Sequence, residues 1–185
     1  MNGNEAVDES RPVFDDQDQD RTILVLTFPE IGERLTPWRD ESQDPGFPAH
    51  ITILTPFFAE SELDDEAHAD LCEICAGIAS FDVNLVSVER LPGFTVLALE
   101  SEREPRALLA ALRERWPQFV PYNGLHGEDP TPHLTIVWPG PEERHERVAT
   151  EVKALLPLTE RATALTLLAR RDHHWTTISE FPFAP

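Results

Sequence analysis

A short pattern that begins with histidine occurs twice in the chain, and it constrains the fold more than any other feature. The two copies read His50-Ile51-Thr52-Ile53 and His133-Leu134-Thr135-Ile136. Each copy has a proline shortly before it and another shortly after it, and each alternates polar and aliphatic residues as a half-buried strand does. A faint internal repeat of this kind predicts two similar lobes that face one another across a cleft.

The alternation within each copy sorts its side chains onto two faces. Residues i and i+2 of a strand project from the same face, so His50 and Thr52 point together while Ile51 faces the core. The second copy behaves in the same way. If the two strands face each other, they bring two imidazoles beside two hydroxyl groups. The candidate catalytic residues are therefore His50, Thr52, His133 and Thr135.

The remaining pattern is that of an α+β protein, because apolar runs and amphipathic stretches are mixed along the chain. Strands are predicted at about 22–28, 50–55, 81–90, 94–100, 133–138, 163–170 and 175–181. Helices are predicted at about 64–79, 101–116 and 141–156, with acidic residues or proline in their first turns. Residues 29–47 contain Pro37, Pro45 and Gly46 and are predicted to form a long connection.

The charge balance limits the class of ligand. The chain has 15 Lys and Arg residues against 34 Asp and Glu, a net charge of −19. Non-specific binding to nucleic acid depends on cations that displace counterions from phosphates, so a protein that coats long DNA or RNA is not expected. A small phosphorylated ligand or one RNA end, held by a few local donors, remains compatible with this charge.

The first 20 residues differ from the rest. They contain seven acidic residues and one arginine, few large apolar groups, and are predicted to be a disordered acidic leader before one domain at 21–185. The N-terminus lacks the apolar region of a signal peptide, and no run is long enough to cross a bilayer. We therefore expect a cytoplasmic protein, as a monomer, that does not bind membranes.

The two histidines and two threonines suit phosphodiester cleavage. One neutral histidine takes a proton from the attacking water or hydroxyl, and the other, protonated, gives a proton to the leaving oxygen. The threonine hydroxyls donate to the non-bridging phosphoryl oxygens. Neither motif contains a carboxylate, and threonine is a poor zinc ligand, so we expect no metal and no other cofactor. A single His-x-Thr would more often be an ordinary strand end, but two matching copies favour a site.

Other residues are secondary candidates. Tyr122, in a loop before the second motif, is placed to stack on a nucleobase, or else to anchor the loop on the core. Arg39, in the connection before the first motif, is a candidate phosphate clamp, or else a solvated arginine. His68 and His145 lie on predicted helices among charged residues and are expected to face solvent.

At these motifs the sequence resembles the 2H phosphoesterases, and within them the bacterial 2′-5′ RNA ligase-like proteins. The likeness extends over residues 44–57 around the first histidine, and over 121–124 and 132–136 around the second. It covers about residues 22–183. The resemblance implies a bilobal, pseudo-symmetric α+β fold, with two antiparallel sheets facing a central cleft and helices outside.

The resemblance also implies an activity. Members of this family open 2′,3′-cyclic phosphates or cleave 2′-5′ linkages, and some join RNA ends without a nucleotide cofactor. By analogy, the two histidines and two threonines carry the chemistry, with acid and base roles that depend on the substrate. The expected partner is a small nucleotide or an RNA terminus. Two alternatives are a non-catalytic module that binds such a ligand in the same cleft, and an ATP-independent 2′-5′ RNA ligase.

Overall fold

The computed structural model describes residues 22–39, 46–172 and 174–185, so the predicted leader at 1–20 lies outside the described residues. The described strands are β1 (Thr22–Thr27), β2 (His50–Leu54), β3 (Phe81–Leu91), β4 (Phe94–Leu99), β5 (His133–Val137), β6 (Leu158–Ala162), β7 (Ala164–Arg171) and β8 (His174–Pro182). The helices are α1 (Pro29–Leu35), α2 (Asp65–Ala76), α3 (Arg103–Arg115) and α4 (Glu142–Lys153), with short 3₁₀ turns at Glu60–Glu62 and Pro121–Gly124. The predicted α+β class is confirmed.

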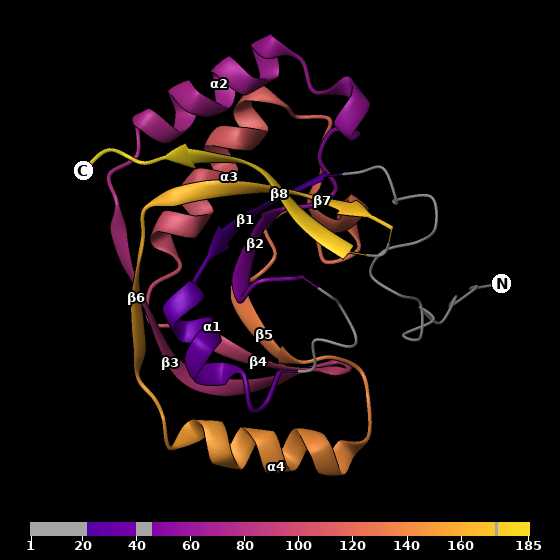
Figure 1. Cartoon of the computed structure of the whole chain (residues 1–185), viewed down its shortest axis with the longest axis vertical. Helices are drawn as coiled ribbons and strands as arrows, with labels where there is room; N and C mark the ends of the chain where they lie inside the picture. Colours follow the sequence, from indigo (N-terminus) through magenta and orange to yellow (C-terminus); the bar gives the residue numbers. More distant parts are fainter. Residues whose placement is uncertain (1–21, 40–45, 173) are drawn as a thin grey trace, which may run out of the picture.

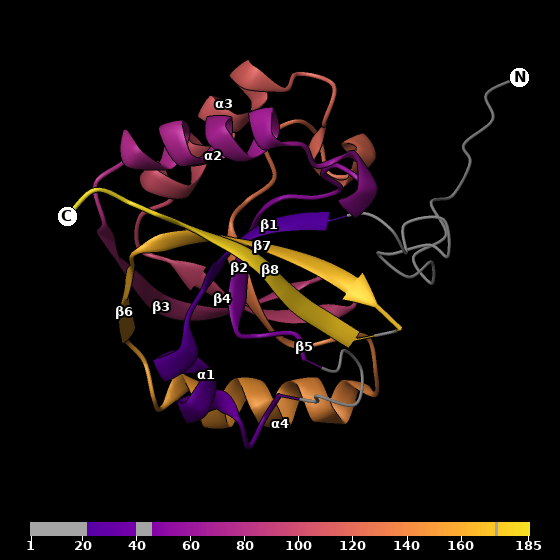
Figure 2. The ribbon, with the colours of Figure 1, turned by 45° about the horizontal axis from the view of Figure 1, so that its top comes forward.

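All eight strands form one antiparallel sheet in the order β6-β3-β4-β5-β2-β1-β7-β8. The sheet has two four-stranded halves, which meet where β5 pairs with β2 at Leu134 and Ile51. The two antiparallel sheets expected from the resemblance are these two halves. The curled sheet runs between α2 and α3 at one end of the molecule and α1 and α4 at the other (Figures 1 and 2). Each half therefore has its own pair of helices.

The core lies behind the two motif strands. Ile51 and Leu134 are fully buried, and they join a large cluster that includes residues from all four helices. This confirms the predicted orientation of the aliphatic positions, with the histidines and threonines on the opposite face of β2 and β5. None of the helices within the described ranges is long and apolar enough to span a membrane.

One helix was not predicted, because α1 lies inside the stretch read as a connection. The helix starts with Pro29, whose fixed φ suits a first turn, and buries Ile31 and Leu35 at i,i+4 spacing. Its first N–H groups are capped from a distant strand: the Glu160 carboxylate accepts from the backbone of Glu30 and Ile31. Seven residues give too short a periodic pattern to outweigh the proline and glycine that follow.

The expectation that His145 faces solvent is wrong. His145 is buried under α4, where its Nδ1 lies 2.7 Å from the hydroxyl of Thr95 on β4. The spacing of the helix explains this position, because 145, 148 and 152 share one face and both Val148 and Val152 are buried. The charged neighbours in sequence point elsewhere. His68 is exposed, as predicted.

Candidate active site

The four candidate catalytic side chains lie at the junction of the two halves of the sheet. Ile51 and Leu134 are register partners on antiparallel strands. The residues that flank this pair lie across from each other on the opposite face, which places His50 beside Thr135 and Thr52 beside His133. Each histidine therefore lies beside the threonine of the other strand.

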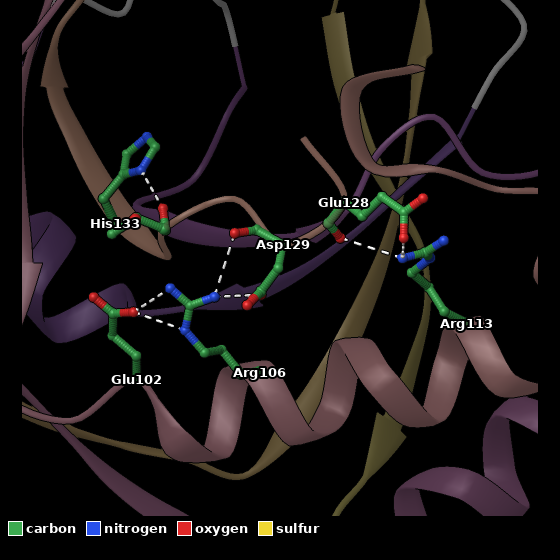
Figure 3. Close-up of polar contacts among 7 residues, drawn as sticks. Glu102, Arg106, Arg113, Glu128, Asp129 and His133 are labelled. Carbon is green, nitrogen blue, oxygen red and sulfur yellow. Dashed lines mark hydrogen bonds and ion pairs between the residues drawn. The ribbon is translucent and has the colours of Figure 1, made fainter. Parts of the chain in front are cut away.

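Both imidazoles are held in the same way. The Nδ1 of His50 lies 2.8 Å from the carbonyl oxygen of Pro48, and the Nδ1 of His133 lies 2.8 Å from that of Thr131. A carbonyl only accepts, so Nδ1 carries the hydrogen in both rings. Figure 3 shows the bond at His133. The Nε2 atoms are left as the nitrogens available for proton transfer.

The two histidines differ in their surroundings. His50 is 8% exposed, whereas His133 is only partly buried. Burial lowers the pKa of His50 to about 4, and the charges of Arg39 and His133 act in the same direction against the hydrogen bond to Pro48. The pKa of His133 is also lowered, first by burial and then by His126. His50 is therefore the histidine more strongly held in its neutral form.

This burial predicts a pH-dependent stability. A histidine whose pKa is lower in the folded state stabilises the fold fully above its ordinary pKa of about 6.5, and this stability is lost as the pH falls toward the folded value. For His50, with a folded pKa of about 4, the free energy of unfolding should fall by about 2 kcal/mol between pH 7 and pH 5. Urea unfolding of the wild type and of His50→Asn at both pH values measures the difference. Equal pH dependence in the two proteins would contradict this prediction.

A small, open pocket lies beside His133. Its walls come from β2, α3 and the loop before β5. The lining residues are Thr52, Ile53, Pro105, Arg106, Leu109, Tyr122, Pro130, Thr131, Pro132 and His133. Two of the predicted catalytic residues, Thr52 and His133, therefore contribute to one concave surface with apolar walls.

Arg106 is a pocket residue that the sequence analysis missed. Its guanidinium forms ion pairs with Glu102, at 2.5 Å, and with Asp129 in the loop before β5 (Figure 3). The spacing of Glu102 and Arg106 on one helix is a sequence signal for the ion pair, but not for a place in the pocket. Because one cation lies between two carboxylates, this side of the pocket has a net negative charge and disfavours a phosphate group.

Tyr122 is both a loop anchor and a pocket residue. Its backbone N–H donates to the carbonyl of Thr55, its φ is 51°, and its ring meets His126 edge-on at 5.1 Å. Burial raises the pKa of its phenol, and an interaction with the Thr52 side chain acts in the opposite direction. A non-glycine residue with this φ is strained, and such strain is common at binding sites. Stacking on a nucleobase stays a prediction.

Arg39 is half-buried rather than solvated. Its Nη2 donates to the carbonyls of Phe47, at 2.8 Å, and Pro48, at 3.1 Å, and its guanidinium lies 6.0 Å from the ring centroid of Trp138. The Pro48 carbonyl also accepts from His50, so Arg39 braces the residues that orient this histidine. A direct contact with phosphate stays a prediction.

The side chains that commonly bind metal ions are dispersed over the described residues. Across 22–39, 46–172 and 174–185, no group of three or more His, Cys, Asp or Glu side chains is arranged to hold a metal ion. Cys75 lies in the core under α2, where burial raises the pKa of its thiol to about 12, and Cys72 is exposed on the same helix. Cys72 and Cys75 are therefore residues of a packed helix rather than ligands of a metal site.

Solved structures share this fold. LigT of E. coli complexed with NADP+ is 17% identical, with a TM-score of 0.56, over 90% of this chain and 99% of that chain. TT0787 of Thermus thermophilus is 16% identical, with a TM-score of 0.54, over 88% of this chain and 97% of that chain. A protein described as a phosphoesterase is 16% identical, with a TM-score of 0.55, over 90% of this chain. At these identities the likeness concerns the fold alone.

Family membership comes from the sequence itself. No curated protein matches the chain. The family model of the 2′-5′ RNA ligase superfamily, however, matches residues 27–174, which include both histidine motifs and most of the domain. The chain therefore belongs to the 2′-5′ RNA ligase superfamily, and its resemblance to the LigT-like 2H phosphoesterases is confirmed.

Proposed function

We propose that this protein is a metal-independent phosphodiesterase that acts on a 2′,3′-cyclic or 2′-5′ phosphodiester of a small nucleotide or an RNA end. The observation that carries the proposal is the pairing of two motif strands that place two Nδ1-tethered imidazoles and two threonines on one face. A diester needs a base on one side of phosphorus and an acid on the other, and this arrangement supplies both.

The unequal burial of the histidines supports one assignment of the two roles for a cyclic phosphate. Nε2 of neutral His50 takes a proton from water as the water oxygen bonds to phosphorus. The bond from phosphorus to one ribose oxygen breaks, and protonated His133 gives its proton to that oxygen. The product is a nucleoside monophosphate with a free neighbouring hydroxyl. Proton exchange with solvent then restores the neutral base and the protonated acid.

The threonines stabilise the charge that grows on the non-bridging oxygens. Thr52 has a further neighbour, because its side chain interacts with the Tyr122 hydroxyl. Tyr122 therefore contacts one of the two threonines that we expect to donate to the phosphoryl group.

The pocket beside His133 supports a nucleotide as the ligand. Its apolar walls include Leu109 and Pro130, and Tyr122 supplies an aromatic ring, which suits a nucleobase. LigT structures hold small nucleotides, including 3′-AMP and ATP. The net charge of −19 disfavours long RNA.

The test is hydrolysis of the four nucleoside 2′,3′-cyclic phosphates by the wild type in excess EDTA. We expect turnover that survives chelation, with one monophosphate isomer as product, identified by chromatography and ³¹P NMR. Loss of turnover in EDTA, restored by added metal, would contradict a metal-independent mechanism. Tight binding by calorimetry without turnover would favour the non-catalytic module.

A further inference from the structure

The His50 ring belongs to an aromatic stack whose other members lie outside the His-x-Thr motif. The ring of Phe47 lies 3.9 Å from the His50 ring, at an interplanar angle of 31°. On its other side, Phe47 stacks on Trp175 of β8 at 4.5 Å and 16°. Phe47 is 7% exposed and Trp175 is 3% exposed. The imidazole is thus packed against a buried ring that is itself held from behind.

The backbone before His50 is fitted to this stack. Gly46 has a φ of 76°, and a Cβ at this position would collide with the His174 ring and with the carbonyl of Trp175. Only glycine combines this φ with such a close approach to β8. Arg39 then holds the Phe47 carbonyl from the other side. The position of the Phe47 ring is therefore fixed by contacts from three parts of the chain.

The second motif has no such aromatic stack. The residue three positions before His133 is Pro130, where the first motif has Phe47. Within the described part of the chain, no aromatic ring contact involves His133. The two histidines have the same carbonyl tether. The aromatic stack is one of the differences between their surroundings, beside Arg39 near His50 and His126 near His133.

We propose that Phe47, supported by Trp175, is a positioning residue that holds His50 as the neutral base and so separates its role from that of His133. The proposal deepens the proposed function and rests on it for the assignment of His50 as the general base. Its physical reason is that the ring excludes water from one face of the imidazole, which disfavours the charged form. It also removes rotation of the imidazole about its Cβ.

A substitution at Phe47 leaves the other groups near His50 unchanged. Arg39, from the segment after α1, and His133, from β5, both lower its pKa. On β8, His174 lies behind Gly46, with its Nδ1 bonded to the carbonyl of Trp175. A change at Phe47 leaves all three in the chain, so a shift of the His50 titration in a folded variant reports the loss of the stacked ring.

The test is an NMR titration of the histidine Cε1–H signals, assigned with His50→Asn, in the wild type and in Phe47→Leu. We expect the His50 midpoint in Phe47→Leu to rise by about one pH unit or more toward its ordinary value, while that of His133 stays unchanged. For cyclic phosphate hydrolysis, kcat should fall about tenfold at pH 7 with KM unchanged, and the acid limb of kcat/KM should move with the midpoint. Phe81→Leu, which breaks the remote stack of Phe81 on Phe183, is the matched control and should leave all of these unchanged.

A folded Phe47→Leu variant with an unmoved His50 midpoint would overturn the proposal. If that variant does not fold, the NMR spectrum of the wild type tests the proposal. The stacked Phe47 ring should shift the ring protons of His50 upfield relative to those of His133. Unshifted protons together with an ordinary titration would overturn the proposal. The titration needs no turnover, so a moved midpoint in an inactive protein supports the positioning role while the proposed function fails.

Discussion

Replacing His50 or His133 with alanine is expected to lower kcat/KM for cyclic phosphate hydrolysis by roughly 10²–10⁴-fold in each case. Each variant loses one proton transfer, and nothing else on this face of β2 and β5 can replace it at the same distance. The double variant should be little worse than either single variant, because the two groups act in one transition state. Steady-state kinetics at pH 7 in EDTA measures all three, and His68→Ala, an exposed histidine on α2, is the control.

The assignment of base and acid makes these two losses distinguishable. A diester with an aryloxide leaving group needs no proton on the departing oxygen, so it should bypass the acid but not the base. We expect His133→Ala to recover most of the wild-type rate on such a substrate, while His50→Ala stays slow. The reverse pattern would exchange the roles of the two histidines, and equal loss in both variants would contradict a division of labour.

The sequence predicted the two motif strands well because their signal is local. Polar and aliphatic residues alternate in each, and the burial of Ile51 and Leu134 follows directly from that alternation. The class of the fold followed from the order of such elements. The repeat and the resemblance predicted that the two motifs face each other across a cleft between two lobes. The direct pairing of β2 with β5 in one sheet was not predicted, because pairing between residues 51 and 134 leaves no local trace in a single sequence.

The features that were missed depend on contacts between distant segments. Helix α1 is capped by Glu160 from β6 and covered by the core, neither of which is visible within its own seven residues. Arg106 joins the pocket only because the loop before β5 folds back onto α3. Phe47 reads as one more apolar residue in a connection, and its contact with His50 requires Trp175 from the last strand. Tertiary packing decides each of these positions.

Replacing Thr52 or Thr135 with valine is expected to lower kcat by roughly 10–10²-fold with little change in KM. Valine keeps the branched shape that suits the strand and removes only the hydroxyl. Loss of one donor to a developing oxyanion costs up to about 10²–10³ in other enzymes, and here the charge is shared by two threonines. The loss should therefore be smaller than for either histidine. Serine at the same positions keeps the donor and should retain most of the activity.

The interaction between Tyr122 and Thr52 allows the two threonines to be distinguished in a double-mutant cycle. Tyr122→Phe should lower kcat in the wild type, because Thr52 then loses the polar neighbour that helps to orient its side chain. In the Thr52→Val background the same change should cost nothing further, since there is no hydroxyl left to orient. In the Thr135→Val background its cost should equal that in the wild type. If Tyr122→Phe instead raises KM equally in all three backgrounds, the tyrosine acts on the nucleotide itself and Thr52 is oriented without it.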